Sequence, residues 1–322
     1  MAQRIAILSV IPRLSYHLRI KLPNSTIFDV LPDKCDTLSK LQNADIVLTD
    51  CDLFLPYTDK LPSVKWVQTT WAGIESLISN LRDKKINYTV TRFSDKSLAL
   101  AMSEYVIAHI FNFERNQRQQ YQNQENKKWI TDGNISDYKL ISDLSVGILG
   151  LGNIGKTIAE KIKMFGATVW GMTRTPLKES LNYIDKHRTI EHLPEVLTNC
   201  DYIINVLPST PSTLGLLNGN ILEKCKNRGS IFINIGRGTI IKETDLLNAL
   251  EQQWILGAIL DVFAEEPLSG KSKLWSLPQV TITPHISGVS RARDIADYFV
   301  ENYQRYIKGE KLLNIANLEE GY

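Results

Sequence analysis

The chain has 322 residues, more than one ordinary hydrophobic core requires, so we expect two globular domains. Its 37 Lys and Arg residues nearly balance 35 Asp and Glu residues, and the formal charge of +2 gives no global reason to expect nucleic acid or a membrane surface as partner. The four cysteines show no metal-ligand spacing, so we expect free thiols in a reducing compartment and no metal site.

Short apolar and β-branched runs recur along the chain and predict strands. The first series covers residues 5–10, 46–49, 66–69 and 88–91, and the second covers residues 146–149, 168–172, 202–207, 230–235, 256–262 and 280–283. Helical patterns separate the runs, and alternation of this kind predicts parallel sheets with helices on their faces. The sequence therefore predicts an α/β protein with two doubly wound parallel sheets.

Two long helical patterns connect these series. Residues 97–113 are almost continuously apolar and predict a long buried helix that links the domains. Residues 291–309 follow the last strand and have no sheet of their own, so we expect them to cross back to the first domain. The N-terminus lacks a signal-peptide pattern and no run approaches the roughly 20 apolar residues of a membrane span, so we expect a cytosolic protein.

A glycine-rich loop follows the first strand of the second series. Residues 146–155 read V-G-I-L-G-L-G-N-I-G, a strand that enters G-x-G-x-x-G ahead of a helical pattern. The glycines allow a tight turn, close approach of the backbone to a pyrophosphate, and close packing of helix on strand. In this context the loop predicts a dinucleotide site, with expected contacts from Gly150, Gly152, Asn153, Ile154 and Gly155.

The end of the next strand bears on which dinucleotide is bound. NAD enzymes usually carry an acid there that accepts hydrogen bonds from the ribose, whereas this chain has Thr173, Arg174 and Thr175. A guanidinium between two hydroxyl groups suits a 2′-phosphate, so NADP(H) is favoured over NAD(H). The alternative is that Arg174 is one more solvated surface arginine.

Three later strand ends carry ionisable residues. N-I-G-R-G places Arg237 directly after one strand, D-V-F-A-E-E-P places Asp261 and Glu266 after another, and T-P-H-I-S-G places His285 after the last. Ligands of open parallel sheets bind at the carboxyl ends of the strands, so these side chains are expected to converge on the cofactor. Taken one at a time, each of these residues also fits an ordinary structural role.

Together these stretches resemble the D-isomer-specific 2-hydroxyacid dehydrogenase family and its glyoxylate/hydroxypyruvate reductase subgroup, over essentially the whole chain. The resemblance implies a catalytic set of Arg237, Glu266 and His285. Reduction of a 2-oxo acid needs a cation to bind the carboxylate and polarise the carbonyl, and an acid to deliver a proton. Arg237 and His285 fit those roles, and a neighbouring carboxylate favours and orients the imidazolium. Glu265 competes with Glu266 for that position.

The resemblance also assigns binding residues. The loop W-A-G-I after the third predicted strand is similar to a family loop that receives the substrate carboxylate, which implies Ala72, Gly73 and Ile74 beside Arg237 and His285. Substrate selectivity is expected to depend on loop shape near Phe54, Trp71 and Trp275. Trp129 resembles a position that packs across a homodimer, or is a local aromatic anchor. The further cofactor contacts implied are Leu207, Pro208, Ile235, Gly236, Asp261, Ser287 and Gly288.

The expected organisation is a flavodoxin-like substrate domain of residues 1–98 and 291–322, with a Rossmann cofactor domain inserted at residues 99–290. The expected activity is reduction of a small 2-oxo acid with hydride from NADPH. A catalytically silent, nucleotide-sensing corepressor is the alternative from another class, since fold alone does not define function. Phosphoglycerate dehydrogenase is another alternative, and Glu266 argues against formate oxidation.

Overall fold

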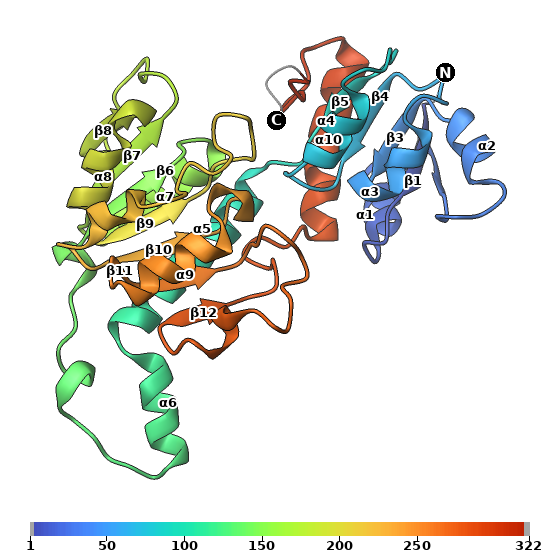
Figure 1. Cartoon of the computed structure of the whole chain (residues 1–322). Helices are drawn as coiled ribbons and strands as arrows, with labels where there is room; N and C mark the ends of the chain where they lie inside the picture. The colour runs from blue at the N-terminus through green and yellow to red at the C-terminus, as the bar shows by residue number, and fades with distance from the viewer. Residues whose placement is uncertain (1–2, 319–322) are drawn as a thin grey trace. The chain divides into compact units, whose positions relative to one another are not determined.

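The computed structural model describes residues 3–318. The chain divides into two compact units, residues 1–97 with 290–322 and residues 98–289 (Figure 1). Each unit contains one sheet in which every strand pair is parallel. The predicted fold class of two parallel-sheet α/β domains is confirmed.

The first unit has a five-stranded sheet. Its strand order 2-1-3-4-5 is that of flavodoxin-like folds. The strands are β1 (Arg4–Leu8), β2 (Thr26–Asp29), β3 (Ile46–Thr49), β4 (Trp66–Thr69) and β5 (Thr89–Thr91). The helices are α1 (Leu14–Lys21), α2 (Thr37–Gln42), α3 (Cys51–Phe54), α4 (Glu75–Leu81) and α10 (Ala292–Lys308), with a 3₁₀ turn η1 (Leu55–Tyr57).

Helix α10 brings the end of the chain back to this sheet. It packs against α1, and its Phe299 ring stacks on Trp66 of β4 with ring centroids 5.0 Å apart. The indole N–H of Trp66 donates to Thr91 Oγ1 at 2.7 Å, so this large side chain is both buried and hydrogen-bonded. The apolar stripe of α10 therefore completes the core of the first unit, although it lies about 200 residues beyond β5 in the sequence.

The second unit has a seven-stranded sheet in the order β12-β11-β10-β9-β6-β7-β8. The chain reverses its direction of winding between β6 and β9, which is the Rossmann arrangement. The strands are β6 (Ser145–Leu149), β7 (Thr168–Thr173), β8 (Lys186–Thr189), β9 (Tyr202–Asn205), β10 (Ser230–Asn234), β11 (Ile255–Leu260) and β12 (Val280–Ile282).

Helices cover both faces of this sheet. The longer ones are α5 (Lys96–Glu114), α7 (Asn153–Met164), α8 (Leu193–Asn199) and α9 (Glu243–Glu251), while α6 (Gln117–Glu125) extends away from the sheet (Figure 1). Short 3₁₀ turns are η2 (Gly133–Ile135), η3 (Ile141–Asp143), η4 (Ile190–His192), η5 (Ile221–Cys225), η6 (Gly238–Ile240) and η7 (Lys273–Ser276). Each helix among residues 3–318 is too short or too polar to span a bilayer.

Helix α5 differs from the fully buried helix that its composition predicts. Its buried residues follow helical spacing along one face, at Leu98, Met102, Val106 and Ile110, whereas Leu100 is 42% exposed. The mean apolarity of a segment does not reveal which side of the helix faces the core. The composition of residues 97–113 therefore predicts more burial than α5 has.

Two edge strands, β2 and β8, are missing from the sequence-based prediction. In both strands the side chains are exposed or half-buried, and β8 reads Lys-His-Arg-Thr. Edge strands are often short and charged, which protects the sheet from pairing with other chains. Hydrophobic periodicity therefore does not mark them.

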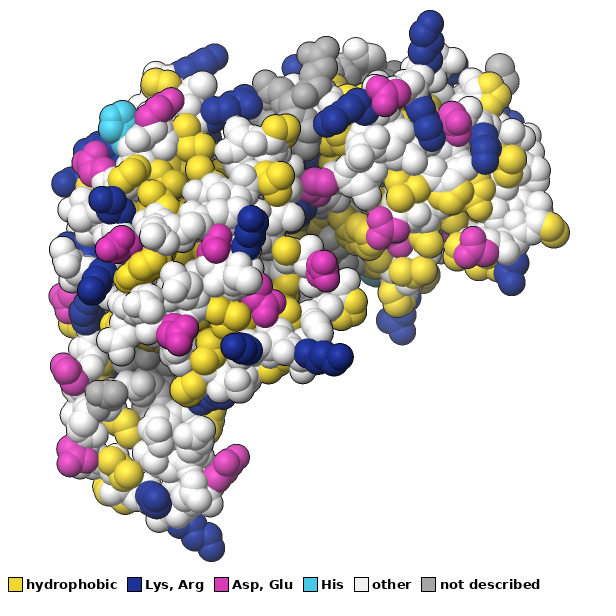
Figure 2. All heavy atoms as spheres, in the orientation of Figure 1, with side chains coloured by type: hydrophobic (Ala, Val, Ile, Leu, Met, Phe, Trp, Pro, Cys, Tyr) yellow, Lys and Arg dark blue, Asp and Glu magenta, His cyan; other side chains and the backbone are white. Residues whose placement is uncertain are grey.

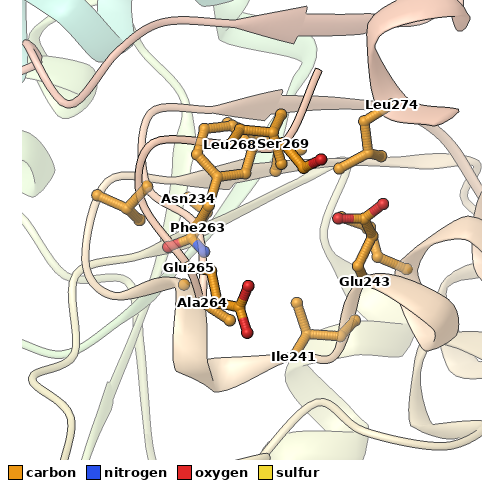
Figure 3. A pocket seen from close by; sticks show the side chains of 13 residues that line it. Asn234, Ile241, Glu243, Phe263, Ala264, Glu265, Leu268, Ser269 and Leu274 are labelled. Atoms are coloured by element: carbon orange, nitrogen blue, oxygen red, sulfur yellow. The ribbon is translucent and has the colours of Figure 1, made fainter. Parts of the chain in front are cut away.

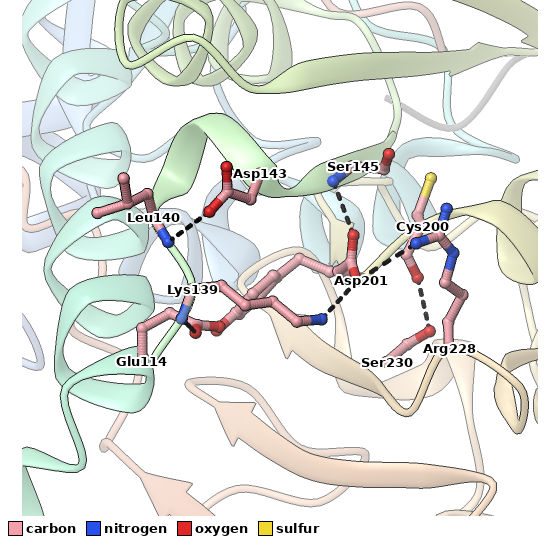
Figure 4. A network of polar contacts seen from close by, with 10 residues as sticks. Glu114, Lys139, Leu140, Asp143, Ser145, Cys200, Asp201, Arg228 and Ser230 are labelled. Carbon is pink, nitrogen blue, oxygen red and sulfur yellow. Dashed lines mark hydrogen bonds and ion pairs between the residues drawn. The ribbon is translucent and has the colours of Figure 1, made fainter. Parts of the chain in front are cut away.

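A polar network ties the helices to the amino edge of the seven-stranded sheet (Figure 4). The Asp201 carboxylate, 5% exposed, accepts the Ser145 N–H at 2.8 Å and Lys139 Nζ at 3.0 Å. Glu114, the last residue of α5, accepts the Tyr202 hydroxyl at 2.6 Å and the Lys139 N–H at 3.1 Å. The two ends of the excursion that contains α6 are thereby fixed to the sheet.

Candidate active site

The glycine loop between β6 and α7 has the geometry that a pyrophosphate site requires. Gly150 adopts a φ of +108°, and a Cβ at Gly155 would lie 1.9 Å from the Gly150 carbonyl oxygen, so both positions need glycine. A Cβ at Gly152 would meet no described atom within 4 Å. Helix α7 begins at Asn153, and the first N–H groups of a helix have no intrahelical acceptor. These features fit the phosphates of a dinucleotide.

The turn after β7 carries the residues expected at the adenosine end of the cofactor. Thr173 is the last residue of β7, and its hydroxyl lies 2.6 Å from the Thr175 carbonyl oxygen and 2.6 Å from His187 Nε2 of β8. Arg174 and Thr175 are exposed. The position at which NAD enzymes usually carry an acid is therefore a hydroxyl that is hydrogen-bonded to the neighbouring strand.

His285 and Glu266 form a hydrogen-bonded pair. His285 Nδ1 lies 2.7 Å from Glu266 Oε2, and the other carboxylate oxygen accepts the Phe263 N–H at 2.8 Å. An ionised carboxylate only accepts, so Nδ1 carries the proton of this bond and Nε2 is directed to the other side of the ring. The His285 side chain is 53% exposed. Glu266 thus orients an imidazole that remains accessible.

Asp261 holds the loop on which His285 stands. Its buried carboxylate accepts the Thr283 hydroxyl at 2.5 Å and the N–H groups of Ile286 and Ser287 at 2.8 and 2.9 Å. The backbone of His285 has a φ of +56°, a left-handed conformation that costs a non-glycine residue roughly 1–2 kcal/mol. Three charge-assisted hydrogen bonds around one turn offset such a cost. Contact of Asp261 with the nicotinamide stays a prediction.

Arg237 follows β10, which is next to β11 in the sheet. Its Nη1 donates to the Gly236 carbonyl oxygen at 2.7 Å, and the side chain is half-buried. A Cβ at Gly238 would lie 1.9 Å from the Phe263 carbonyl carbon, so the loops after β10 and β11 cross in direct contact. Arg237, Glu266 and His285 therefore follow three adjacent strands, β10, β11 and β12, at the carboxyl edge of one sheet.

The structure distinguishes the two consecutive glutamates. Glu266 pairs with His285, whereas Glu265 lines a cavity of about 290 Å³ beside α9 (Figure 3). Across this cavity lies Glu243, whose carboxylate accepts the Ser272 hydroxyl at 2.7 Å. Glu265 consequently belongs to a different face of the loop from the His285 pair.

The remaining residues that the sequence predicts to contact the cofactor either pack against the glycine loop or are buried in the second unit. Leu207 packs against Gly150 and Gly236, because a Cβ at either glycine would approach Leu207 atoms to 3.1 and 2.8 Å. Ile235 and Ser287 are buried, and a Cβ at Gly288 would lie 2.6 Å from Met102 of α5. The cofactor contacts assigned to Leu207, Pro208, Ile235, Gly236, Ser287 and Gly288 stay predictions.

In the first unit, the predicted carboxylate-binding loop has well-defined supports. Arg92 Nη1 donates to the Ala72 carbonyl oxygen at 3.1 Å, and the Thr70 hydroxyl donates to the buried Asp50 carboxylate at 2.6 Å. Asp50 also accepts the Ser9 hydroxyl and the Val10 N–H, each at 2.8 Å. Substrate binding by Ala72, Gly73 and Ile74 stays a prediction.

The side chains near which substrate selectivity is expected to be decided differ in exposure, and their part in selectivity stays a prediction. Phe54 is fully buried in the core of the first unit, with its ring edge-to-face against Tyr88, so it fills the interior and has no surface to offer a ligand. Trp71 and Trp275 are 36% and 52% exposed. An apolar residue in a short helix gives no sequence signal that separates a core position from a pocket wall.

Sequence reasoning missed several supporting residues: His187, Asp50 and Arg92. Each acts through a hydrogen bond to a residue far along the chain, and none stands in a motif. No group of three or more His, Cys, Asp or Glu side chains among the described residues is arranged to hold a metal ion.

Comparison with known proteins gives the family. Residues 107–287 match the family model described as D-isomer specific 2-hydroxyacid dehydrogenase, NAD binding domain. The chain is 32% identical over 263 residues to glyoxylate/hydroxypyruvate reductase A of Yersinia enterocolitica, an alignment that covers 80% of this chain and 82% of that protein. The chain therefore belongs to the D-isomer specific 2-hydroxyacid dehydrogenase family and is an NAD(P)-dependent dehydrogenase, as the sequence predicted.

Solved structures agree over nearly the full length. A family member from Aeromonas salmonicida subsp. salmonicida has a TM-score of 0.86 and 31% identity, covering 98% of this chain and 100% of that one. An NADPH-dependent glyoxylate/hydroxypyruvate reductase from Sinorhizobium meliloti, solved with NADP and sulfate, has a TM-score of 0.85 and 26% identity, covering 99% and 100%. The similarity thus includes both units.

Proposed function

We propose that this enzyme reduces a small 2-oxo acid of the glyoxylate or hydroxypyruvate kind to the D-2-hydroxy acid with NADPH. The observation that carries the proposal is the 2.7 Å bond between His285 Nδ1 and Glu266 Oε2, which joins the loops after β12 and β11. Strand β11 is the neighbour of β10, and the loop after β10 carries Arg237. The pair of His285 and Glu266 lies at the same sheet edge as the glycine loop. The names of the Yersinia and Sinorhizobium relatives support the substrate class.

In this mechanism the nicotinamide, when bound, supplies the hydride that adds to the carbonyl carbon of the substrate. Arg237 binds the substrate carboxylate and polarises the carbonyl through its guanidinium N–H groups. His285 gives the proton on Nε2 to the carbonyl oxygen, so that one hydride and one proton convert the ketone into an alcohol. Glu266 holds Nδ1–H and stabilises the imidazolium before transfer.

NADPH preference is assigned to Arg174. Arg174 stands between Thr173 and Thr175 in the chain and is exposed, and it directly follows the position at which NAD enzymes usually carry an acid, which would repel a phosphate. Relatives solved with NADP or NADPH support this assignment. Arg174→Ala is expected to lower kcat/KM with NADPH by about tenfold or more and to leave kcat/KM with NADH nearly unchanged, since a charged hydrogen bond contributes roughly 1.5–3 kcal/mol.

The test of the activity is the decrease in NADPH absorbance with glyoxylate, hydroxypyruvate and a graded series of larger 2-oxo acids. Turnover of the small acids supports the proposal. No turnover of any 2-oxo acid, with NADPH still bound, would favour the catalytically silent corepressor type. A preference for a phosphorylated hydroxyacid would favour a phosphoglycerate dehydrogenase.

A homodimer is part of this proposal. Residues 115–140 form an arm around α6, and Figure 2 shows hydrophobic side chains on its surface, at the lower end of the view. Trp129 is 95% exposed, and Tyr121 and Ile130 are 60% and 42% exposed. Exposed apolar groups of this kind mark interaction surfaces. Sedimentation as a monomer at micromolar concentration would contradict the dimer. A cytoplasmic location also stays a prediction.

A further inference from the structure

His187 is a histidine that the proposed reaction does not use. It lies on the edge strand β8, is half-buried, and hydrogen-bonds the hydroxyl of Thr173 at 2.6 Å. Thr173 begins the turn that carries Arg174. His187, which belongs to no sequence motif, therefore contacts the turn that carries the proposed phosphate-binding residue, Arg174.

The protonation state of this contact follows from counting donors. A threonine hydroxyl has a single proton, and the Thr175 carbonyl oxygen, 2.6 Å away, is able only to accept. The Thr173 hydroxyl therefore donates to Thr175, and His187 Nε2 must donate to Thr173. The result is a chain of two hydrogen bonds, from His187 through Thr173 to Thr175, which closes the turn on both sides of Arg174.

We infer that His187 is a positioning residue for cofactor selectivity. It holds the Thr173–Thr175 turn in the conformation in which Arg174 meets a 2′-phosphate, and it links NADPH binding to its own protonation. This inference rests on the proposed NADPH preference. It adds a second group, on a different strand, to the recognition of the phosphate.

The charges around His187 determine the direction of this linkage. β8 packs against β7, which has no ionisable side chain, and against η4 and α8. Arg188 is paired with Glu195 of α8 at 2.6 Å, and Asp185 with Lys163 of α7 at 2.7 Å. The remaining charged or titratable groups on these elements and on the β7–β8 connection are Arg174, Lys178, Glu179, Tyr183, Lys186, Glu191 and His192.

Burial, and then Arg188, lowers the pKa of His187 below its ordinary value, so the ring is neutral in the free enzyme at neutral pH. A nearby 2′-phosphate favours the imidazolium, so NADPH takes up a proton on binding and NADH does not. By linkage, the affinity for NADPH relative to NADH increases as the pH falls through the His187 titration. The phosphate itself titrates near pH 6 with the opposite effect, since it loses charge.

Two substitutions separate the hydrogen bond from the charge. His187→Gln keeps a donor where Nε2 stands but has no titration, whereas His187→Ala removes both. Dissociation constants of NADPH and NADH are measured by fluorescence titration on the full chain, from about pH 5.5 to pH 8.5. The matched control is His192→Gln, an exposed histidine whose Nδ1 contacts Thr189 at 3.2 Å on the turn that follows β8.

We expect His187→Ala to weaken NADPH binding roughly threefold to tenfold at neutral pH, with NADH binding and kcat little changed. We expect His187→Gln to bind NADPH like the wild type at neutral pH and more weakly than the wild type as the pH falls, because both proteins share the phosphate titration and only the wild type gains the imidazolium. Two results would each overturn this inference and leave the proposed cofactor preference standing. One is wild-type NADPH affinity in His187→Ala, and the other is a wild-type pH profile of NADPH affinity in His187→Gln. A wild type that binds NADH as tightly as NADPH overturns the proposed cofactor preference as well.

Discussion

The two edges of the seven-stranded sheet each contain a buried carboxylate. Asp261 at the carboxyl edge is fully buried and Asp201 at the amino edge is 5% exposed, and each accepts backbone N–H groups. Asp261 holds a turn that presents an exposed histidine, whereas Asp201 holds Lys139 and the first residue of β6. Asp261 and Asp201 are the same residue type and are both buried. Their different roles therefore follow from the groups that each carboxylate holds in place.

The largest effect is expected at the carboxyl edge. His285→Ala removes the proposed acid, so kcat for 2-oxo acid reduction should fall about 100-fold or more in a steady-state assay. The melting temperature should change little, because the side chain is 53% exposed. His192→Ala, at another exposed histidine, is the control and should retain wild-type turnover. Near-wild-type activity of His285→Ala would contradict the proposed role of His285 as the proton donor.

The consecutive glutamates sharpen the contrast within one loop. Glu266→Ala leaves His285 Nδ1 without its carboxylate, and misorientation of a catalytic group costs between roughly 10-fold and 100-fold in kcat. Glu265→Ala, which alters the cavity beside α9, is the matched control and should not change kcat. Equal losses in the two variants would mean that the loop as a whole, and not the His285 pair, is responsible.

The amino edge should respond in stability and not in turnover. Asp201→Ala leaves the Ser145 N–H and Lys139 without their acceptor, at a cost of about 1–3 kcal/mol in the free energy of unfolding. The melting temperature should fall by roughly 2–4 °C for each kcal/mol, with kcat per folded molecule unchanged. Asp143→Ala, on an exposed turn near the same network, is the control. A large loss of kcat in Asp201→Ala would show that the two edges are coupled.

The smallest effect concerns the thiols. Burial raises the pKa of Cys51 to about 12 and of Cys225 to about 11, and it raises the pKa of Cys200 as well, whereas Cys35 is exposed. Thiolates are the reactive form, so a thiol reagent at neutral pH should label one cysteine rapidly in the native protein and four after denaturation. Rapid labelling of more than one native thiol would show that these cores open readily.

The predictable part of the fold is the part that hydrophobic pattern specifies. Ten of the twelve strands stand in apolar runs, and the glycine loop of residues 150–155 follows its strand directly. The edge strands β2 and β8 lack such runs because edge positions favour polar side chains. The pairing of Glu266 with His285 was inferable from motif and spacing, although nothing in the sequence excluded Glu265.

What the sequence determined by itself is local: which segments bury apolar side chains, where a backbone must turn without a Cβ, and which strand ends carry charge. The tertiary structure alone decided which of these groups meet. It placed His187 of an unpredicted strand against Thr173, directed Glu265 and Glu266 to different sides of one loop, and enclosed Phe54 in a core. A hydrogen bond acts over about 3 Å in space and carries no information about separation along the chain.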